Sequence, residues 1–371
     1  MKILSYSYSD YPINGWKVPI IDFNNLNLIV GISGAGKTKL MDSIINIKNV
    51  VNNGFSNSTI GGAWKTILNE NDKKFHWEIT VSKYLQNKVK VLRETLSMED
   101  GNSKIKIVER DKNTFTFNGQ KLPKLSDTES ALSLLKNESI ISDLFKGFGH
   151  FLKRDLSITS LKEAATTHMI TFKEKESLKK EKNIYHVINI EGLNDKLDVL
   201  HKSFNDIFEN ICHYFLSIFP FIKRVDIKKQ ESPFGLVPIF CIKERNIDNW
   251  IPLSELSSGM QKIIFMLTDI CSLPEGSVYF IDEYENSLGI NAINIIPEIL
   301  IEYNNKIQFF ITSHHPYLIN NIPVKNWYVC YRSGQNVNVK YGKELEERYG
   351  PSKQKAFINL MNDPIYSEGI E

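Results

Sequence analysis

One eight-residue segment near the N-terminus constrains the fold of this chain more than any other. Residues 31–38 read Gly-Ile-Ser-Gly-Ala-Gly-Lys-Thr and fit the pattern G-x-x-x-x-G-K-[ST]. The apolar run Leu26–Val30 before it favours a buried strand, and the spacing of Lys39–Ile47 is typical of a helix. A strand, a glycine-rich turn and a helix in this order form a loop whose backbone N–H groups surround a phosphate at the helix N-terminus.

Each polar position of this loop has an expected role. We expect the Lys37 ammonium to reach the β- and γ-phosphates of ATP and the Thr38 hydroxyl to coordinate Mg²⁺. The glycines let the backbone turn its N–H groups inward. The expected nucleotide-binding residues of the loop are Gly31, Ser33, Gly34, Ala35, Gly36, Lys37 and Thr38.

A second segment ends an apolar strand with two acids. Val278–Ile281 is apolar throughout, and Asp282 and Glu283 follow it directly. A carboxylate at the end of a strand beside a phosphate loop can hold Mg²⁺, and a neighbouring carboxylate can orient and deprotonate a water. We therefore expect Asp282 to bind the metal and Glu283 to act on the attacking water.

Two more segments allow a structural and a functional interpretation. Ser257, Ser258 and Gly259 precede an apolar helical run over residues 263–270, so they form either a plain helix N-cap or an anion site at a helix N-terminus. His314 follows the apolar strand expected at residues 307–312. It either caps the end of that strand or hydrogen-bonds the γ-phosphate or the water.

The phosphate loop, the Ser-x-Gly signature, the Asp-Glu strand and the histidine, in this order, resemble the ABC-type ATPases. The resemblance covers roughly residues 1–122 and 230–330. It implies an α/β P-loop ATPase head in which the signature of one subunit closes over the nucleotide of another. Ser257 and Gly259 would then contact the γ-phosphate across a dimer, His314 would be the switch histidine, and residues 285–288 would link the two sites.

The branch of this family is indicated by spacing and by departures from the usual motifs. The signature lies about 220 residues after the phosphate loop, roughly twice the usual gap in transporter ATPases, and Leu-Ser-Ser-Gly-Met replaces Leu-Ser-Gly-Gly-Gln. Gln86 is the only guess for a glutamine loop. The inserted residues and the N-terminal strands look more like SMC, RecF and OLD-type ATPases, which act on DNA or with nucleases.

Two stretches are similar to stand-alone ATPases of bacterial antiphage defence systems of the PARIS and Septu types. Residues 282–289 depart from the commoner Asp-Glu-Pro-Glu-x-x-Leu-His-Pro, and residues 312–316 read Thr-Ser-His-His-Pro. This resemblance implies a separate partner effector. OLD proteins continue into a nuclease domain with an Asp-x-Asp, whereas the roughly 55 residues after His315 contain none. We therefore expect any nuclease to be a second protein.

The alternation of elements predicts an α/β domain interrupted by helices. We expect an N-terminal ATPase lobe over residues 1–125, with a small antiparallel sheet over residues 73–122, a helical insertion over 126–225, and a C-terminal ATPase lobe over 226–371. The last lobe should end in a strand pair around residues 332–335 and two short helices. The turn dipeptides Asp100-Gly101 and Asn118-Gly119 separate the strands of the small sheet.

The insertion contains an apolar seam in steps of four and three, which predicts one long helix. The helix packs its stripe either on its own core or against another subunit. The charged run over residues 173–182 is typical of a solvated face. The seam consists of Leu193, Leu197, Leu200, Phe204, Ile207, Ile211, Tyr214 and Ile218.

Composition limits the other possibilities. The formal net charge is +2, which neither favours nor excludes DNA as a partner. The chain has no apolar run of about 18 residues, no signal peptide, and four widely spaced cysteines, so we expect a cytoplasmic protein without a membrane partner. A DNA-binding repair ATPase, a transporter subunit and a scaffold that barely hydrolyses ATP remain alternatives. Tyr11 and Trp16 are candidates for stacking on adenine.

Overall fold

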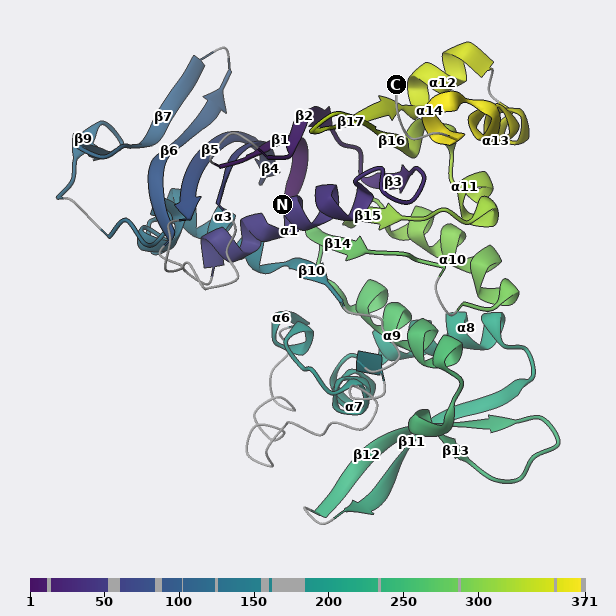
Figure 1. Ribbon diagram of the computed structural model, residues 1–371. Helices are drawn as coiled ribbons and strands as arrows, with labels where there is room; N and C mark the ends of the chain where they lie inside the picture. Colours follow the sequence, from purple (N-terminus) through teal and green to yellow (C-terminus); the bar gives the residue numbers. More distant parts are fainter. Residues whose placement is uncertain are drawn as a thin grey trace. The chain divides into compact units, whose positions relative to one another are not determined.

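The chain divides by its internal contacts into two compact units. The computed structural model describes residues 1–11, 15–52, 61–83, 89–101, 103–123, 126–154, 160–161, 184–232, 235–285, 288–349 and 352–367. The first unit, here called the core unit, comprises Met1–Lys153, Gly276–Tyr284 and Asn304–Glu371. The second, here called the signature unit, comprises Arg154–Glu275 and Glu285–Tyr303. Figure 1 shows the elements of both.

A single large sheet organises the core unit. Its strand order is β10-β14-β15-β3-β16-β17-β2-β1-β4-β5-β6-β7-β8-β9. In chain order the strands are β1 (Lys2–Asp10), β2 (Lys17–Asp22), β3 (Leu26–Val30), β4 (Gly62–Glu70), β5 (Lys73–Lys83), β6 (Val89–Asp100), β7 (Ser103–Arg110), β8 (Phe115–Phe117), β9 (Gln120–Lys121), β10 (Phe151–Lys153), β14 (Ser277–Ile281), β15 (Ile307–Thr312), β16 (Trp327–Ser333) and β17 (Asn336–Tyr341).

Parallel pairing at one end of the sheet gives way to antiparallel pairing at the other. β10, β14, β15, β3 and β16 run parallel, and every residue of β3, β14 and β15 is buried. Fully buried, mostly apolar strands of this kind are typical of a sheet covered on both faces. From β1 to β9 in the sheet order, neighbouring strands pair antiparallel.

The core unit also contains α-helices that pack with the sheet. They are α1 (Lys37–Asn52), α2 (Ala131–Leu134), α3 (Ser139–Gly149), α11 (Pro316–Asn321), α12 (Gly342–Tyr349), α13 (Lys353–Asn362) and α14 (Pro364–Ser367). Buried side chains of α1 and α3, such as Ile44 and Phe148, join those of β4 and β5, such as Trp64 and Trp77, in one hydrophobic core. The predicted strand pair around residues 332–335 is confirmed as β16 and β17, and three helices, α12 to α14, follow it where two were expected.

The antiparallel strands predicted over residues 73–122 are confirmed as β5 to β9, which form one end of the main sheet. The strands over residues 73–121 are present, but β4 joins them to β1, and the whole set continues the main sheet. These strands do not form a sheet of their own because β4 pairs with β1, and β1 pairs with β2 on its other side. The predicted turn at Asn118-Gly119 is confirmed, with φ of 48° and 78°, as a two-residue hairpin turn requires.

The signature unit combines helices with a three-stranded antiparallel sheet. Its elements are α6 (Ile184–Ile188), α7 (Leu193–Ser203), α8 (Asn205–Ile218), β11 (Ile222–Ser232), β12 (Gly235–Glu244), β13 (Ile251–Pro252), α9 (Ser258–Ser272) and α10 (Ile290–Tyr303). A buried ion pair joins α7 to α9, where Lys196 Nζ lies 2.7 Å from Asp269 Oδ1. Arg154 Nε lies 3.2 Å from the other carboxylate oxygen of Asp269.

The single long helix predicted over residues 193–218 is wrong. The helix breaks at Phe204, whose φ of −140° and ψ of 54° are not helical. Ser203, Asn205 and Asp206 around it compete for backbone hydrogen bonds and are weak helix formers. Most of the seam faces the core of its own unit, since five of its residues are buried: Leu193, Leu197, Leu200, Ile211 and Ile218.

Four further expectations from the sequence concern the domain division, a charged run, membrane spans and the cysteines. The three-part division at residues 125 and 225 stays a prediction, because contacts place residues 126–153 with the core unit and 226–275 with the signature unit. The charged run over residues 173–182 lies outside the described residues. Within the described part of the chain, no helix is long and apolar enough to cross a membrane. The four cysteines are buried, and none of them forms a disulfide.

The buried ion pair generates a prediction about stability. Burial alone would raise the pKa of Asp269, but Lys196 and Arg154 lower it, so the carboxylate is charged in the fold. Replacing Asp269 by Ala leaves the Lys196 ammonium buried without this partner, and we expect the free energy of unfolding to fall by about 3–5 kcal/mol in urea titrations. The paired variant Lys196→Met/Asp269→Leu should recover most of that loss. Equal losses in both variants would contradict this account.

Candidate nucleotide-binding site

The ends of three parallel strands bring the sequence motifs to one edge of the sheet. β14 pairs with β15 through Ile281 and Ile311, and β15 pairs with β3 through Thr312 and Ile29. Each strand is followed by one motif: the acids after β14, the histidine segment after β15, and the phosphate loop after β3. Because parallel strands end on the same side, these motifs share one edge although they are up to about 280 residues apart in the chain.

The phosphate loop takes a conformation that only glycine accommodates at its ends. Gly31 and Gly36 have φ of 148° and 97°. A Cβ on Gly31 would lie 2.6 Å from the carbonyl oxygen of Cys330, and one on Gly36 would lie 2.7 Å from Cγ2 of Val337. Residues of strands β16 and β17 therefore pack against the loop. Glycine is required at both positions because there is no space for a Cβ and because φ is positive.

The functional side chains of the loop lie at the start of α1. Lys37 Nζ donates hydrogen bonds to the carbonyl oxygens of Gly31 at 2.7 Å and Ile32 at 2.9 Å. These contacts hold the ammonium inside the loop. Ser33, Gly34 and Thr38 are exposed, whereas Ala35 is buried in the core beneath them.

The Thr312 hydroxyl forms hydrogen bonds with both acids of the second motif, Asp282 and Glu283. The sequence pattern alone assigns Thr312 no role. Its hydroxyl donates to Oδ1 of Asp282 at 2.5 Å and accepts the backbone N–H of Glu283 at 2.8 Å. Thr312 is only 1% exposed, so this geometry is enclosed by the sheet. Glu283 has a φ of 45°, in the left-handed region that few residues other than glycine adopt. Its side chain is exposed.

Lys153 is a second residue that sequence reasoning missed. It ends β10, which pairs in parallel with β14, and its Nζ lies 2.6 Å from Asp42 Oδ1 and 3.7 Å from Asp282 Oδ2. Lys153 thus connects the acidic strand to helix α1, which follows the phosphate loop. Its only sequence signal is a short apolar pair before two basic residues, which is too common to be informative.

The two histidines after β15 have different surroundings. His315 caps α11, with Nδ1 accepting the backbone N–H of Tyr317 at 3.2 Å. Ser313 is buried, and its N–H donates to the carbonyl oxygen of Ile29 in β3. The His314 side chain is exposed at the same strand end. The capping role therefore belongs to His315, and the role of the exposed His314 as a switch histidine stays a prediction.

The signature segment forms the start of α9 in the signature unit. Ser257 is the N-cap, and its hydroxyl accepts the backbone N–H of Met260 at 3.3 Å. Gln261, which is 2% exposed, donates from Nε2 to the carbonyl oxygens of Leu253 and Ser254 and so fixes the turn before the helix. The capping interpretation is confirmed. Ser257 is also exposed, and Ser258 and Gly259 are partly exposed.

The contacts of the described residues do not support the remaining candidates for nucleotide binding, Trp16, Tyr11 and Gln86. The guanidinium of Arg332 lies 4.3 Å from the ring centroid of Trp16 and covers one face of the indole. Tyr11 is partly buried and forms no contact that indicates a nucleotide. Gln86, the guess for a glutamine loop, lies outside the described residues, as do Asn286 and Ser287 of the linking loop.

The donor set at the strand ends suits Mg²⁺, although the described residues include no cluster of three or more His, Cys, Asp or Glu side chains able to hold a metal. Mg²⁺ prefers a few oxygen ligands and keeps several waters. The exposed Thr38 hydroxyl and the Asp282 carboxylate, whose side chain is 23% exposed, are oxygen donors of this kind. The assignment of each site residue stays a prediction.

The sheet and its loop define a P-loop ATPase with the fold of an ABC-type ATPase head. The chain belongs to the AAA-domain family described as putative AbiEii toxin, type IV toxin–antitoxin system, whose profile matches residues 100–320, more than half of the chain. The matched range includes the signature, the acidic strand and the histidine segment. The phosphate loop lies before it.

The fold is similar to that of one solved SMC head, and two further SMC heads match with lower scores. A crystal structure of an SMC head bound to the C-winged helix domain of ScpA matches with a TM-score of 0.51 and 12% identity, covering 92% of this chain and 97% of that chain. The SMC head domain from Thermotoga maritima has a TM-score of 0.44 at 13% identity, covering 92% and 99%. An SMC head with an extended coiled coil bound to the C-terminal domain of ScpA, from Pyrococcus furiosus, has a TM-score of 0.48 at 12% identity, covering 93% and 98%. No curated protein sequence matches significantly.

The Thr312 bridge generates a prediction about catalysis. Thr312→Val keeps the shape of the side chain but removes the hydroxyl that orients Asp282 and the Glu283 amide. We expect the rate of ATP hydrolysis at saturating Mg²⁺ and ATP to fall about 10- to 100-fold, as for other residues that orient a metal ligand. Thr312→Ser keeps the hydroxyl and should retain most of the rate. A Thr312→Val protein as active as wild type would show that the bridge has no catalytic importance.

Proposed function

We propose that this chain binds Mg·ATP between two copies of itself, hydrolyses it, and uses the cycle to control a partner effector, a nuclease of antiphage defence. The observation that carries the ATPase part is the shared edge of β3, β14 and β15. There the phosphate loop, the bridged acids and the exposed His314 follow neighbouring strands.

Charge neutralisation is the first part of the proposed chemistry. The loop N–H groups and the Lys37 ammonium bind the phosphate chain, and Lys37 exchanges its two carbonyl partners for phosphate oxygens. Thr38 and Asp282 would hold Mg²⁺, which supplies positive charge to the β- and γ-phosphate oxygens. Lys153 beside Asp282 keeps that carboxylate near a positive charge and ties it to α1.

Orientation of the water is the second part. The Glu283 carboxylate extends from a backbone that Thr312 fixes, so its side chain leaves the strand end at a defined point. A carboxylate held there can accept a proton from water attacking the γ-phosphate in line. His314, exposed at the neighbouring strand end, hydrogen-bonds the γ-phosphate or the water and so distinguishes ATP from ADP.

Completion of the site by a second copy is the third part. Ser257 to Gly259 present an exposed helix N-terminus, which favours a negatively charged group. In ABC-type ATPases the signature closes over the nucleotide of the other subunit, and the motif order here supports the same arrangement. ATP binding then closes the dimer, and hydrolysis or release reopens it.

Three observations support a partner protein. The residues over 282–289 and 312–316 are similar to stand-alone ATPases of antiphage defence. The family description names a putative toxin of a type IV toxin–antitoxin system, which is a two-component arrangement. The SMC head with the same fold was solved bound to a domain of another protein, ScpA. We infer that the dimer opens and closes a binding surface for the effector.

Native mass spectrometry of the protein purified from its own operon tests this proposal. With Mg·ATP, Glu283→Gln should accumulate as a dimer that retains ATP, because the closed state forms but the water is not activated. Lys37→Ala is the matched control and should remain monomeric under the same conditions. A co-purifying second protein in the dimer sample, identified by peptide sequencing, would support the effector.

Two outcomes would overturn parts of the proposal. If Glu283→Gln and wild type both remain monomeric with ATP, the sandwiched dimer is wrong. If the dimer forms without any second protein but binds DNA with a steep dependence on salt, the effector role is wrong and the DNA-binding alternative holds.

A further inference from the structure

One lysine of the core unit lies between two carboxylates. The Lys153 ammonium at the end of β10 is 2.6 Å from Oδ1 of Asp42 on α1 and 3.7 Å from Oδ2 of Asp282 after β14. All three residues belong to the core unit. Asp282 is the carboxylate that we expect to bind Mg²⁺, so a positive charge of the protein itself lies beside an expected metal ligand.

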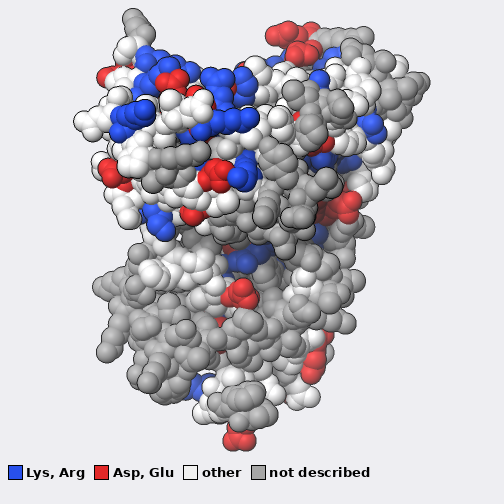
Figure 2. Space-filling model, turned by 60° about the vertical axis from the view of Figure 1, so that its left-hand side comes forward, with Lys and Arg blue, Asp and Glu red and all other residues white. Residues whose placement is uncertain are grey.

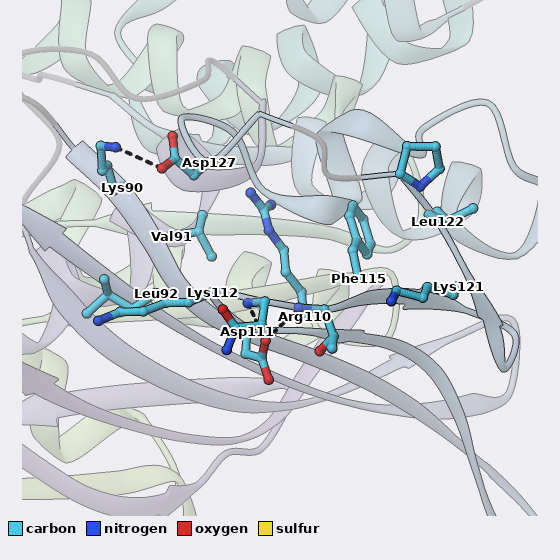
Figure 3. Close-up of a pocket in the computed structure, with 13 residues that line it drawn as sticks. Lys90, Val91, Leu92, Arg110, Asp111, Lys112, Phe115, Lys121, Leu122 and Asp127 are labelled. Carbon is cyan, nitrogen blue, oxygen red and sulfur yellow. Dashed lines mark hydrogen bonds and ion pairs between the residues drawn. The ribbon is translucent and has the colours of Figure 1, made fainter.

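The surroundings of Lys153 differ from those of an ordinary surface ion pair. In the pocket at the antiparallel end of the sheet, Lys90 pairs with Asp127 at 2.9 Å, and the two side chains are 45% and 42% exposed (Figure 3). Figure 2 shows Lys and Arg side chains among Asp and Glu on the surface, where water screens such pairs. The side chains of Lys153 and Asp282 are 27% and 23% exposed, so their charges are screened less.

Asp42 lets Lys153 give up Asp282 without losing every partner. A partly buried ammonium without a carboxylate is costly, because its charge is neither hydrated nor paired. Asp42 is the nearer of the two carboxylates, so the ammonium can stay paired with it while Asp282 binds a metal ion. Asp42 also lies one helical turn after Thr38, the other expected metal ligand, and therefore on the same side of α1.

An ammonium and a metal ion compete for one carboxylate. Two positive charges a few ångströms apart repel each other, and the charge of Lys153 partly neutralises Asp282. Without nucleotide, Asp282 therefore attracts a divalent cation less than a carboxylate without this neighbour would. The phosphates of ATP bring negative charge to the adjacent loop and offset the repulsion.

We propose that Lys153 is a positioning residue that occupies Asp282 until ATP arrives, so that Mg²⁺ enters the site together with ATP and not before it. After hydrolysis, loss of the γ-phosphate favours the return of the ammonium to Asp282 and thereby the release of the metal. The inference rests on the proposed function in one respect, the assignment of Asp282 as a metal ligand. It adds the residue that controls the affinity of the site for the metal.

Titration of the nucleotide-free, full-length protein with Mn²⁺ tests this role, with the free ion measured by electron paramagnetic resonance. We expect Lys153→Met and Lys153→Gln to bind Mn²⁺ roughly tenfold more tightly than wild type, because the competing charge is lost. Lys153→Arg keeps the charge and should bind as wild type does. Adding Asp282→Asn to Lys153→Met should abolish the gain, which locates the ion at Asp282.

Lys48→Met is the matched control. The Lys48 ammonium also joins α1 to β10, by donating to the carbonyl oxygen of Phe151 at 2.8 Å, so it shares any purely structural role of Lys153. This variant should leave the affinity for Mn²⁺ unchanged. The proposal is overturned if the two uncharged Lys153 variants bind Mn²⁺ as wild type does, or if Lys48→Met produces an equal gain.

A second titration, with the non-hydrolysable analogue AMP-PNP present, separates this inference from the proposed function. We expect the analogue to tighten Mn²⁺ binding by a larger factor in wild type than in Lys153→Met. Equal factors, together with loss of Mn²⁺ binding in Asp282→Asn, would refute the role of Lys153 and leave the metal assignment intact. If Asp282→Asn binds Mn²⁺ with the analogue as tightly as wild type does, the assignment itself fails, and the inference fails with it.

Discussion

The site depends first on the parallel register of β14, β15 and β3. This register places Thr312 between the acidic strand and the strand of the phosphate loop, because Ile311 lies opposite Ile281 and Thr312 lies opposite Ile29. From that position its hydroxyl meets the Asp282 carboxylate and the Glu283 amide together. A shift of one residue in β15 would turn Thr312 to the other face of the sheet and separate the two acids from their support.

The parts of the fold that could be predicted from sequence are those that local patterns determine. The three strands are mostly apolar, and the glycines at residues 31 and 36 belong to the loop pattern itself, so these features are visible without any tertiary contact. The N-cap at Ser257 is equally local, since its hydroxyl bonds a residue only three positions further on. The site motifs could therefore be found from their order, even though their meeting at one edge depends on the sheet.

The parts that could not be predicted depend on contacts between distant residues. β10 has only three residues, and it is a strand because β14, more than a hundred residues later, pairs with it. Lys153 could not be recognised without that pairing. The break at Phe204 was hidden for another reason: the apolar seam continues across it and masks the weak helix formers Ser203, Asn205 and Asp206 on either side.

Two consecutive residues at the boundary between the two units each form an ion pair within their own unit. Lys153 ends the core unit, and its ammonium lies between Asp42 and Asp282 at the nucleotide site. Arg154 begins the signature unit, and its guanidinium binds Asp269 on α9, the helix that Ser257 starts. Each of these ion pairs lies within one unit, so adjacent residues of the chain bind a carboxylate of the nucleotide site in the core unit and a carboxylate of the signature helix in the other unit.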